Sequence, residues 1–374
     1  MTYIRLWRRF AQRGNLVSIK YKEVLITGGC GFIGSNLAVY LKKKYPYLKI
    51  VSLDNLVRRG SELNVKRLKE NNIEFIKGDV RKSKDLAKIT SIDLLIECSA
   101  EPSVSAGYKE SPRYVLDTNL FGAVNCFELA REKKADIIFL STSRIYPYDK
   151  INSLRIVKED SRFKWQDEQG IEISGWSGEG IDVDFSLEGV RSMYGATKLC
   201  AEIILKEYIN MYGLQGLINR CGVIGGPWQF GKVDQGVFSL WMLAHYFKRP
   251  LNYIGFDGEG RQVRDLLHID DFCELIDIQI NSLDKISGQI YNVGGGKNIS
   301  LSLREATQLC EEISGNKINI TAKKDTRPAD LAVYITDNKK VTSQLNWQPK
   351  KTARQILEDI YQWIKDNEKQ LSKL

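Results

Sequence analysis

The segment EVLITGGCGFIGSN, residues 23–36, decides the fold. Its apolar beginning predicts a buried strand, and the glycines that follow have a G-x-x-G-x-x-G spacing at the start of a predicted helix. Glycines at such a turn allow the backbone to approach a pyrophosphate, whose charge the helix N-terminus stabilises. The residues that we expect to contact a dinucleotide here are Gly28, Gly31, Phe32, Ile33 and Gly34.

Apolar runs of the same kind recur through the first half of the chain, at 49–54, 73–80, 93–100 and 136–143. Near-continuous apolar runs separated by helical patterns are typical of a parallel sheet that is covered on both faces. Residues 111–134 have the pattern of one such amphipathic helix. The predicted fold class is therefore α/β, a Rossmann-like doubly wound parallel sheet with a smaller mixed α/β C-terminal domain that binds the substrate.

Three parts of the chain are expected from its composition. Residues 1–20 form a basic N-terminal extension that we expect to be disordered, although a short amphipathic helix on an anionic surface is the alternative. Residues 21–215 are expected to form the dinucleotide-binding domain, with an insertion or lid at 147–190 that is rich in Gly, Ser, Asp and Trp. Residues 216–374 are expected to form mainly the substrate domain, with some segments returning to the first domain.

Composition argues against several other classes of protein. The net charge of +9 falls to +3 without the six basic residues of segment 1–22, which gives a nucleic-acid role little support. No apolar run reaches the roughly 18 residues of a membrane span. Seven scattered cysteines without a CxxC, and no signal-peptide pattern, favour a reduced, cytoplasmic protein. Two histidines exclude a His-rich metal site, and we expect no metal.

Carboxylates after the second and third predicted strands bear on the cofactor. Asp54 lies twenty residues beyond Gly34, where a carboxylate accepts hydrogen bonds from an adenosine ribose. A carboxylate there favours NAD over NADP, whereas the nearby Arg58 and Arg59 favour the reverse; we predict NAD. Asp79 and Val80 are placed to meet the adenine, or they belong to an ordinary loop.

The sequence MYGATK at 193–198 places Tyr194 and Lys198 four residues apart on a predicted helix, and therefore on one face. A lysine beside a phenol favours the phenolate, which would make Tyr194 a general base. A packed tyrosine and a solvated lysine fit the same spacing. Thr142 ends a predicted strand, where it would bind a substrate hydroxyl or satisfy backbone groups.

These residues, with GDV at 78–80, NLFGAVN at 119–125 and RDLLHIDD at 264–271, resemble the extended short-chain dehydrogenase/reductase family of nucleotide-sugar epimerases and dehydratases over about residues 22–365. The resemblance implies that Tyr194 transfers a proton, Lys198 lowers its pKa and holds the nicotinamide ribose, and Thr142 orients the substrate hydroxyl. It also implies an enzyme with bound NAD, a nucleotide-sugar substrate and a homodimer formed through helices near 111–134 and 195–212. Further cofactor contacts are implied for Asn55, Ala100 and Asn119.

One branch of the family, the CDP-sugar 2-epimerases, is similar in DQG at 234–236 and QVRD at 262–265. By this resemblance Arg264 and Arg327 meet the substrate pyrophosphate, and a salt bridge to a nearby acid is the alternative for both. Substrate contacts are also implied for Glu101, Arg220, Gln235 and Gly236. A UDP-hexose 4-epimerase is the alternative. A 4,6-dehydratase is disfavoured because Ser143 and Arg144 stand where such relatives carry Asp-Glu. A reductase and a non-catalytic NAD-binding protein are the remaining alternative functions.

Overall fold

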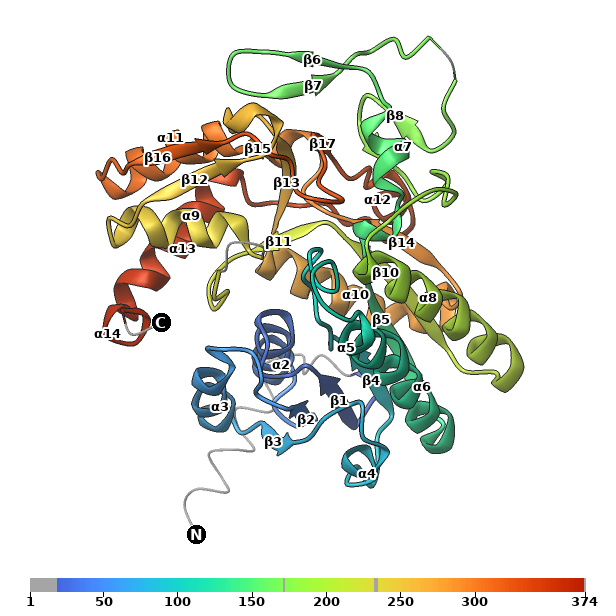
Figure 1. Ribbon diagram of the computed structural model, residues 1–374. Helices are drawn as coiled ribbons and strands as arrows, with labels where there is room; N and C mark the ends of the chain where they lie inside the picture. The colour runs from blue at the N-terminus through green and yellow to red at the C-terminus, as the bar shows by residue number, and fades with distance from the viewer. Residues whose placement is uncertain (1–18, 171, 232–234, 373–374) are drawn as a thin grey trace.

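The computed structural model describes residues 19–170, 172–231 and 235–372, and in it β1 (Glu23–Thr27) lies inside a seven-stranded sheet (Figure 1). The strand order is β14-β10-β5-β4-β1-β2-β3, and every pairing in this sheet is parallel. The other strands are β2 (Lys49–Asp54), β3 (Glu74–Lys77), β4 (Leu94–Glu97), β5 (Asp136–Thr142), β10 (Gly216–Cys221) and β14 (Ile290–Val293).

Helices cover both faces of this sheet. Side chains of β1 alternate, so Val24 and Ile26 pack in one apolar cluster and Leu25 packs in another. The first cluster includes α2 (Phe32–Lys44) and α10 (Ile269–Ile286), and the second includes α6 (Gly122–Lys133) and α8 (Met193–Tyr212). The shorter α3 (Ser61–Glu70) and α4 (Ser83–Leu86) follow β2 and β3. The prediction of a doubly wound, Rossmann-like α/β sheet is confirmed.

The helix expected over 111–134 is interrupted. It begins as α5 (Arg113–Val115), continues as a π-helical turn over Leu116–Phe121, and only then becomes α6. Such a turn widens the helix locally and often occurs at functional sites. Here it contains Asn119, whose side chain is buried.

Much of the C-terminal half forms a smaller mixed unit. Its sheet has the order β11 (Val223–Gly225), β13 (Val263–His268), β15 (Ser300–Ser302), with β17 (Val333–Tyr334) also paired to β13; only the β13–β15 pairing is antiparallel. A separate parallel pair joins β12 (Leu251–Ile254) to β16 (Ile320–Lys323). The helices are α9 (Val237–Tyr246), α11 (Leu303–Ser314), α13 (Ala353–Asp366) and α14 (Glu368–Leu371).

Four elements after residue 215 belong to the large α/β layer rather than to this unit. The strands β10 and β14 pair in its sheet, and the helices α10 and α12 (Lys339–Leu345) pack in the same apolar cluster as β1. The chain therefore passes between the large sheet and the smaller unit more than once. The smaller unit lies beyond the edge of the sheet at which β1, β2, β4 and β5 end (Figure 1).

The segment 147–190 stands beside β13 and β17 at the end of the molecule away from β1 (Figure 1). It contains α7 (Tyr148–Asn152), the hairpin β6 (Ile156–Lys158) and β7 (Phe163–Trp165), and the short pair β8 (Trp176–Ser177) and β9 (Gly180–Ile181). Trp165 is buried and meets Trp176 edge to face, with ring centroids 6.2 Å apart. These tryptophans hold the insertion together from within.

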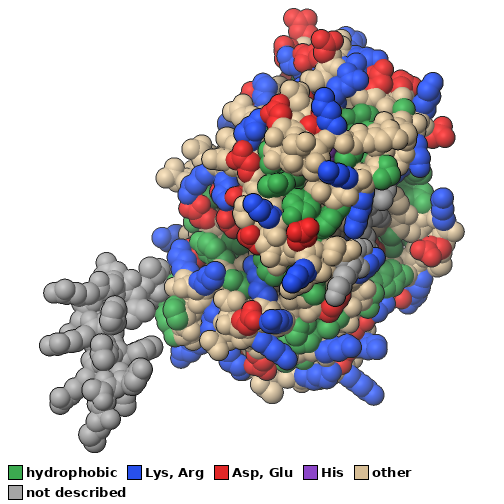
Figure 2. All heavy atoms as spheres, turned by 90° about the vertical axis from the view of Figure 1, so that its left-hand side faces the viewer, with side chains coloured by type: hydrophobic (Ala, Val, Ile, Leu, Met, Phe, Trp, Pro, Cys, Tyr) green, Lys and Arg blue, Asp and Glu red, His purple; other side chains and the backbone are tan. Residues whose placement is uncertain are grey.

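The molecular surface mixes both signs of charge. On the face seen in Figure 2, Lys and Arg side chains lie interspersed with Asp and Glu. No helix in the described ranges is long and apolar enough to cross a bilayer. The basic extension expected over residues 1–20 lies, except for its last two residues, outside the described part of the chain.

Candidate active site

A cleft of about 370 Å³ lies where β1, β2, β4 and β5 end. Parallel sheets of this kind bind ligands beyond the carboxyl ends of their strands. Most of the residues predicted from the sequence line it together, namely Gly28, Gly31, Phe32, Ile33, Gly34, Asp54, Asn55, Val80, Ala100, Glu101, Thr142, Tyr194, Lys198, Gln235 and Gly236. Residues separated by up to about two hundred positions in the chain thus meet at one edge of the sheet.

The glycine turn after β1 has no room for side chains. Gly28 has a φ of +61°, and a Cβ on it would lie 2.8 Å from the carbonyl oxygen of Cys98. A Cβ on Gly34 would lie 2.5 Å from the carbonyl oxygen of Gly28. Because α2 begins directly after Gly31, the first N–H groups of that helix face the cleft and form a site for phosphate oxygens.

Polar groups around the turn suit a dinucleotide. Asp54 accepts hydrogen bonds from the backbone N–H of Cys30 at 3.0 Å and of Leu56 at 2.8 Å, while burial raises its pKa. Ser99 and Thr118 also line the cleft, and their buried hydroxyls have no hydrogen-bond partner within the described structure. Buried polar atoms of this kind call for a ligand or water. Sequence reasoning missed both, since single hydroxyls carry no spacing signal.

Thr142, Tyr194 and Lys198 meet in the same cleft. Ser192 caps α8 by accepting a hydrogen bond from the N–H of Gly195 at 3.2 Å, which fixes the helix start beside the end of β5. Burial raises the pKa of Tyr194 to about 12, whereas a hydrogen bond from the Thr142 hydroxyl and the charge of Arg144 act in the opposite direction. The phenol and the hydroxyl that was predicted beside it thus line the same cleft.

Lys198 has a partner that the sequence reasoning missed. Its ammonium nitrogen lies 3.4 Å from Oε2 of Glu97 at the end of β4, and the two side chains are only 3% and 1% exposed. The alternative of a solvated lysine is therefore wrong. The available signal was the single acid in the apolar run LLIEC, because an acid inside a buried strand needs a cation or hydrogen-bond donors.

Two predicted cofactor residues do not line the cleft. Asp79 forms an ion pair with Arg81 at 2.5 Å, and this charge-assisted hydrogen bond holds the pKa of Asp79 at about 2. Asn119, on the π-helical turn, accepts from the N–H of Glu101 at 2.7 Å and donates to the carbonyl oxygen of Glu101 at 3.0 Å. Asn119 thus fixes the loop that carries Ala100 and Glu101 instead of facing a cofactor.

The three predicted substrate arginines lie outside the cleft lining as well. Arg220 is buried, and its Nη2 lies 2.9 Å from Oε2 of Glu202 on α8. The predicted contact between Arg220 and the substrate is corrected accordingly, because the guanidinium is paired with this acid inside the protein. Arg264 donates to Oδ1 of Asp330 at 2.8 Å. Arg327, which lies close to Asp330 in the sequence, is half-buried and does not line the cleft.

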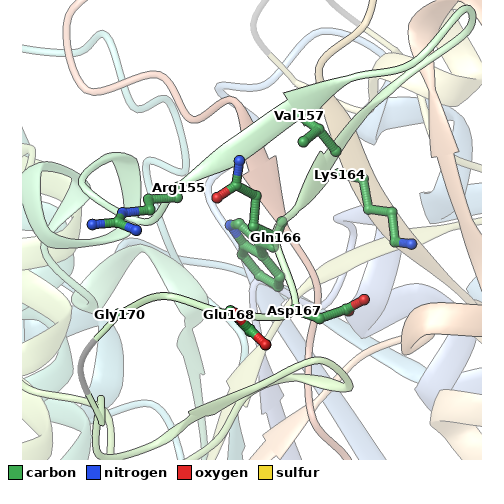
Figure 3. Close-up of a pocket in the computed structure, with 8 residues that line it drawn as sticks. Arg155, Val157, Lys164, Gln166, Asp167, Glu168 and Gly170 are labelled. Carbon is green, nitrogen blue, oxygen red and sulfur yellow. The ribbon is translucent and has the colours of Figure 1, made fainter.

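The insertion 147–190 contributes no described residue to the cleft. A separate hollow lies on its hairpin, lined by Arg155, Val157, Lys164, Trp165, Gln166, Asp167, Glu168 and Gly170 (Figure 3). The lining comes from one continuous stretch and contains none of the predicted site residues. Trp165 lines this hollow, and neither Trp165 nor Trp176 lines the cleft, so the lid expected over 147–190 does not cover the cleft in this structure.

Across the described ranges, no group of three or more His, Cys, Asp or Glu side chains is arranged to hold a metal ion. Asp234, the first residue of the DQG motif, lies outside the described residues, whereas Gln235 and Gly236 line the cleft.

Comparisons with known proteins agree with this geometry. The profile of the NAD dependent epimerase/dehydratase family matches residues 24–294, and the chain belongs to that family, whose cofactor is NAD. The chain is 29% identical to the CDP-paratose 2-epimerase of Salmonella typhi over 349 residues, covering 91% of this chain and 98% of that protein. It is also 29% identical to the UDP-glucuronate 4-epimerase of Thermodesulfobacterium geofontis over 360 residues, with 92% and 96% covered.

Among solved structures, the UDP-glucuronic acid 4-epimerase of Bacillus cereus, in complex with UDP-glucuronic acid and NAD, has a TM-score of 0.73 at 23% identity and covers 92% of this chain and 99% of its own. This likeness confirms the fold. The family defines an enzyme that acts on nucleotide sugars, and the relatives include epimerases that act at different carbons.

Proposed function

We propose that the protein is a redox-neutral nucleotide-sugar epimerase that inverts C2 of a CDP-deoxyhexose. The observation that carries the proposal is that Thr142, Tyr194 and Lys198 line one cleft together with the glycine turn. A scaffold that only bound NAD would have no need of this arrangement. The likeness to CDP-paratose 2-epimerase supports the position of the inverted carbon.

Each site residue of the chain has a separate role in the proposed reaction. The cleft would hold NAD, whose nicotinamide would supply a reversible hydride acceptor for the sugar carbon. Tyr194, as the phenolate, takes the proton of the sugar hydroxyl at its phenolic oxygen and later gives it back. Thr142 orients that hydroxyl, and Lys198 supplies the positive charge that favours the phenolate. The glycine turn holds the cofactor phosphates.

The sugar must be able to present either face to the cofactor, which requires polar groups that hold the nucleotide while the sugar turns. Gln235 lines the cleft, and its Nε2 has no acceptor within the described structure. Glu101 is also in the lining, held by Asn119. These two side chains are our proposed contacts to the sugar.

Arg264 and Arg327 are proposed pyrophosphate ligands on resemblance alone. Arg264 would have to exchange its bond to Asp330 for the substrate phosphate. We propose no comparable role for Arg220, because its guanidinium is buried against Glu202.

Dehydration is disfavoured by the residues next to Thr142. Elimination of water needs an acid and a base beyond the tyrosine, and Ser143 and Arg144 provide neither. A UDP-hexose 4-epimerase remains the second candidate function, since the same three residues would act on C4 of a sugar bound in another orientation. The UDP-glucuronate 4-epimerase, whose 29% identity to this chain equals that of the CDP-paratose enzyme, supports this second candidate function.

Proton NMR tests the proposal directly. Purified full-length protein, without added cofactor, is incubated with CDP-paratose and, separately, with UDP-glucose and UDP-galactose. We expect CDP-paratose to be converted to CDP-tyvelose and the UDP-hexoses to stay unchanged. Interconversion of the UDP-hexoses alone would move the function to 4-epimerisation, and no conversion even with added NAD would remove the substrate assignment.

We also propose a homodimer, formed through α6 and α8, which pack side by side (Figure 1). On α8, Ile203 is 56% exposed and Met211 65%, and Phe121 directly before α6 is 49% exposed, so these side chains could be covered at such an interface. Light scattering coupled to gel filtration would report twice the chain mass of 42.7 kDa. A place in the cytoplasm and in surface-polysaccharide synthesis is part of the proposal.

A further inference from the structure

Glu97 is a carboxylate buried below the reacting groups without any role in the proposed chemistry. It ends β4, its residue is 0% exposed, and its Oε2 lies 3.4 Å from the ammonium of Lys198. Its Oε1 accepts from the N–H of Ser99 at 2.9 Å and from the hydroxyl of Thr27 at 3.5 Å. The carboxylate is therefore held from two sides and cannot turn away from the lysine.

Lys198 is surrounded by few other charges. Its ammonium lies 4.2 Å from the ring centroid of Phe139, and Cys98 and Cys221 line the same cleft. Burial raises the pKa of both thiols, so both are neutral near pH 7. Glu97 is thus the one carboxylate within ion-pair distance of Lys198 in the described residues.

Tyr194 has a different set of neighbours. The hydroxyl of Thr142 and the charge of Arg144 favour its phenolate, whereas the charge of Glu101 opposes it. Lys198 lies one helical turn further along α8 and borders the same cleft. A positive charge that is paired with a carboxylate exerts a smaller net field on its surroundings than an unpaired one.

We propose that Glu97 is a positioning residue for the reaction: it anchors the Lys198 ammonium at the floor of the cleft and offsets its charge, so that it sets how strongly Lys198 favours the Tyr194 phenolate. This rests on the proposed role of Tyr194 as the base. Glu97 therefore restrains ionisation of the phenol as long as its own charge is present.

Charge balance gives the sign of the effect. In the wild type, loss of the phenol proton takes the group of Glu97, Lys198 and Tyr194 from neutral to one negative charge. In E97Q the same loss takes the group from one positive charge to neutral, which is easier in a buried site. The E97Q phenol should therefore ionise at a lower pH, by about one pH unit or more.

The experiment follows Tyr194 itself, without any sugar. Full-length protein saturated with NAD is labelled with 3-fluorotyrosine, and the Tyr194 resonance is identified by its absence in Y194F. Fluorine NMR then gives the pH midpoint of Tyr194 ionisation in the wild type, in E97Q and in E202Q. E202Q is the matched control, because Glu202 is equally buried and paired with Arg220 but does not line the cleft.

We expect a lower midpoint in E97Q and an unchanged one in E202Q. An E97Q midpoint equal to or above the wild type would overturn the proposal. If E97Q does not fold, the double variant E97Q/K198M removes both charges and is expected to fold. Its midpoint should stay close to that of the wild type, and a rise of about one unit or more would show that Lys198 acts unopposed. Since no sugar is used, these outcomes are independent of the substrate assignment.

Discussion

Gly195 is a close contact between α8 and the turn that follows β5, the strand that ends in Thr142. A Cβ on Gly195 would lie 2.0 Å from the carbonyl oxygen of Arg144, and ordinary contacts of this kind begin at 3.4 Å. In Gly195→Ala, either the start of α8 or the turn after β5 must therefore move by at least about 1.4 Å, the difference between the two distances.

That displacement would separate Thr142 from Tyr194, the two groups on which the proposed chemistry depends. A misplacement of about 1 Å can cost roughly a hundredfold in rate, so we expect kcat of G195A to fall by about 10²-fold. Overpacking at a rigid contact should also lower the free energy of unfolding by about 1–3 kcal/mol. The rate is followed by NMR on the sugar that the wild type converts, and the stability by urea denaturation.

Gly213, at the other end of the same helix, is the matched control. It has a φ of +65° and no atom within 4 Å of an added Cβ. G213A should lose about 1–2 kcal/mol for the left-handed backbone and retain the wild-type kcat. Wild-type activity in G195A, or an equal loss of kcat in G213A, would refute the link between this contact and the catalytic geometry.

Three further results are expected. Y194F should lose about 10²–10⁴ in kcat while retaining bound NAD, measured by NMR turnover and by cofactor absorbance after denaturation; loss of NAD as well would assign Tyr194 a binding role. Because burial raises the pKa of Tyr194 to about 12, the phenolate fraction grows as pH rises, and kcat/KM should increase from pH 6 to pH 9; a decrease over that range would exclude Tyr194 as the base. R220M leaves the buried carboxylate of Glu202 unpaired and should cost about 3–5 kcal/mol in urea denaturation, most of it recovered in R220M/E202Q; full stability of R220M alone would contradict a structural ion pair.

Local sequence patterns were enough to predict the sheet and the cofactor turn. The apolar run at 49–54 is β2 in full, and the glycines at 28, 31 and 34 lie where their spacing indicated. Both could be predicted because an apolar strand pattern and the spacing of glycines are properties of short segments. The single long helix over 111–134 was wrong in detail. Its π-helical turn depends on the fit of Asn119 to the Glu101 loop, which no local pattern encodes.

Pairings between distant charged residues were the least predictable part of the site. Arg220 and Glu202, and likewise Lys198 and Glu97, lie 18 and 101 positions apart, and only the register of the strands with α8 brings them together. An arginine expected at the substrate therefore became part of the protein interior, and an acid in an apolar strand went unnoticed.

We propose that the sugar is oxidised and reduced again at one carbon, with Tyr194 moving only the hydroxyl proton. The most direct test is to run the conversion in D2O with the nucleotide sugar that the protein is found to epimerise. We predict that the inverted carbon carries no deuterium, since its hydrogen leaves and returns without contacting solvent. Deuterium at that carbon would mean that a base removes the carbon-bound hydrogen as a proton, and it would contradict the account.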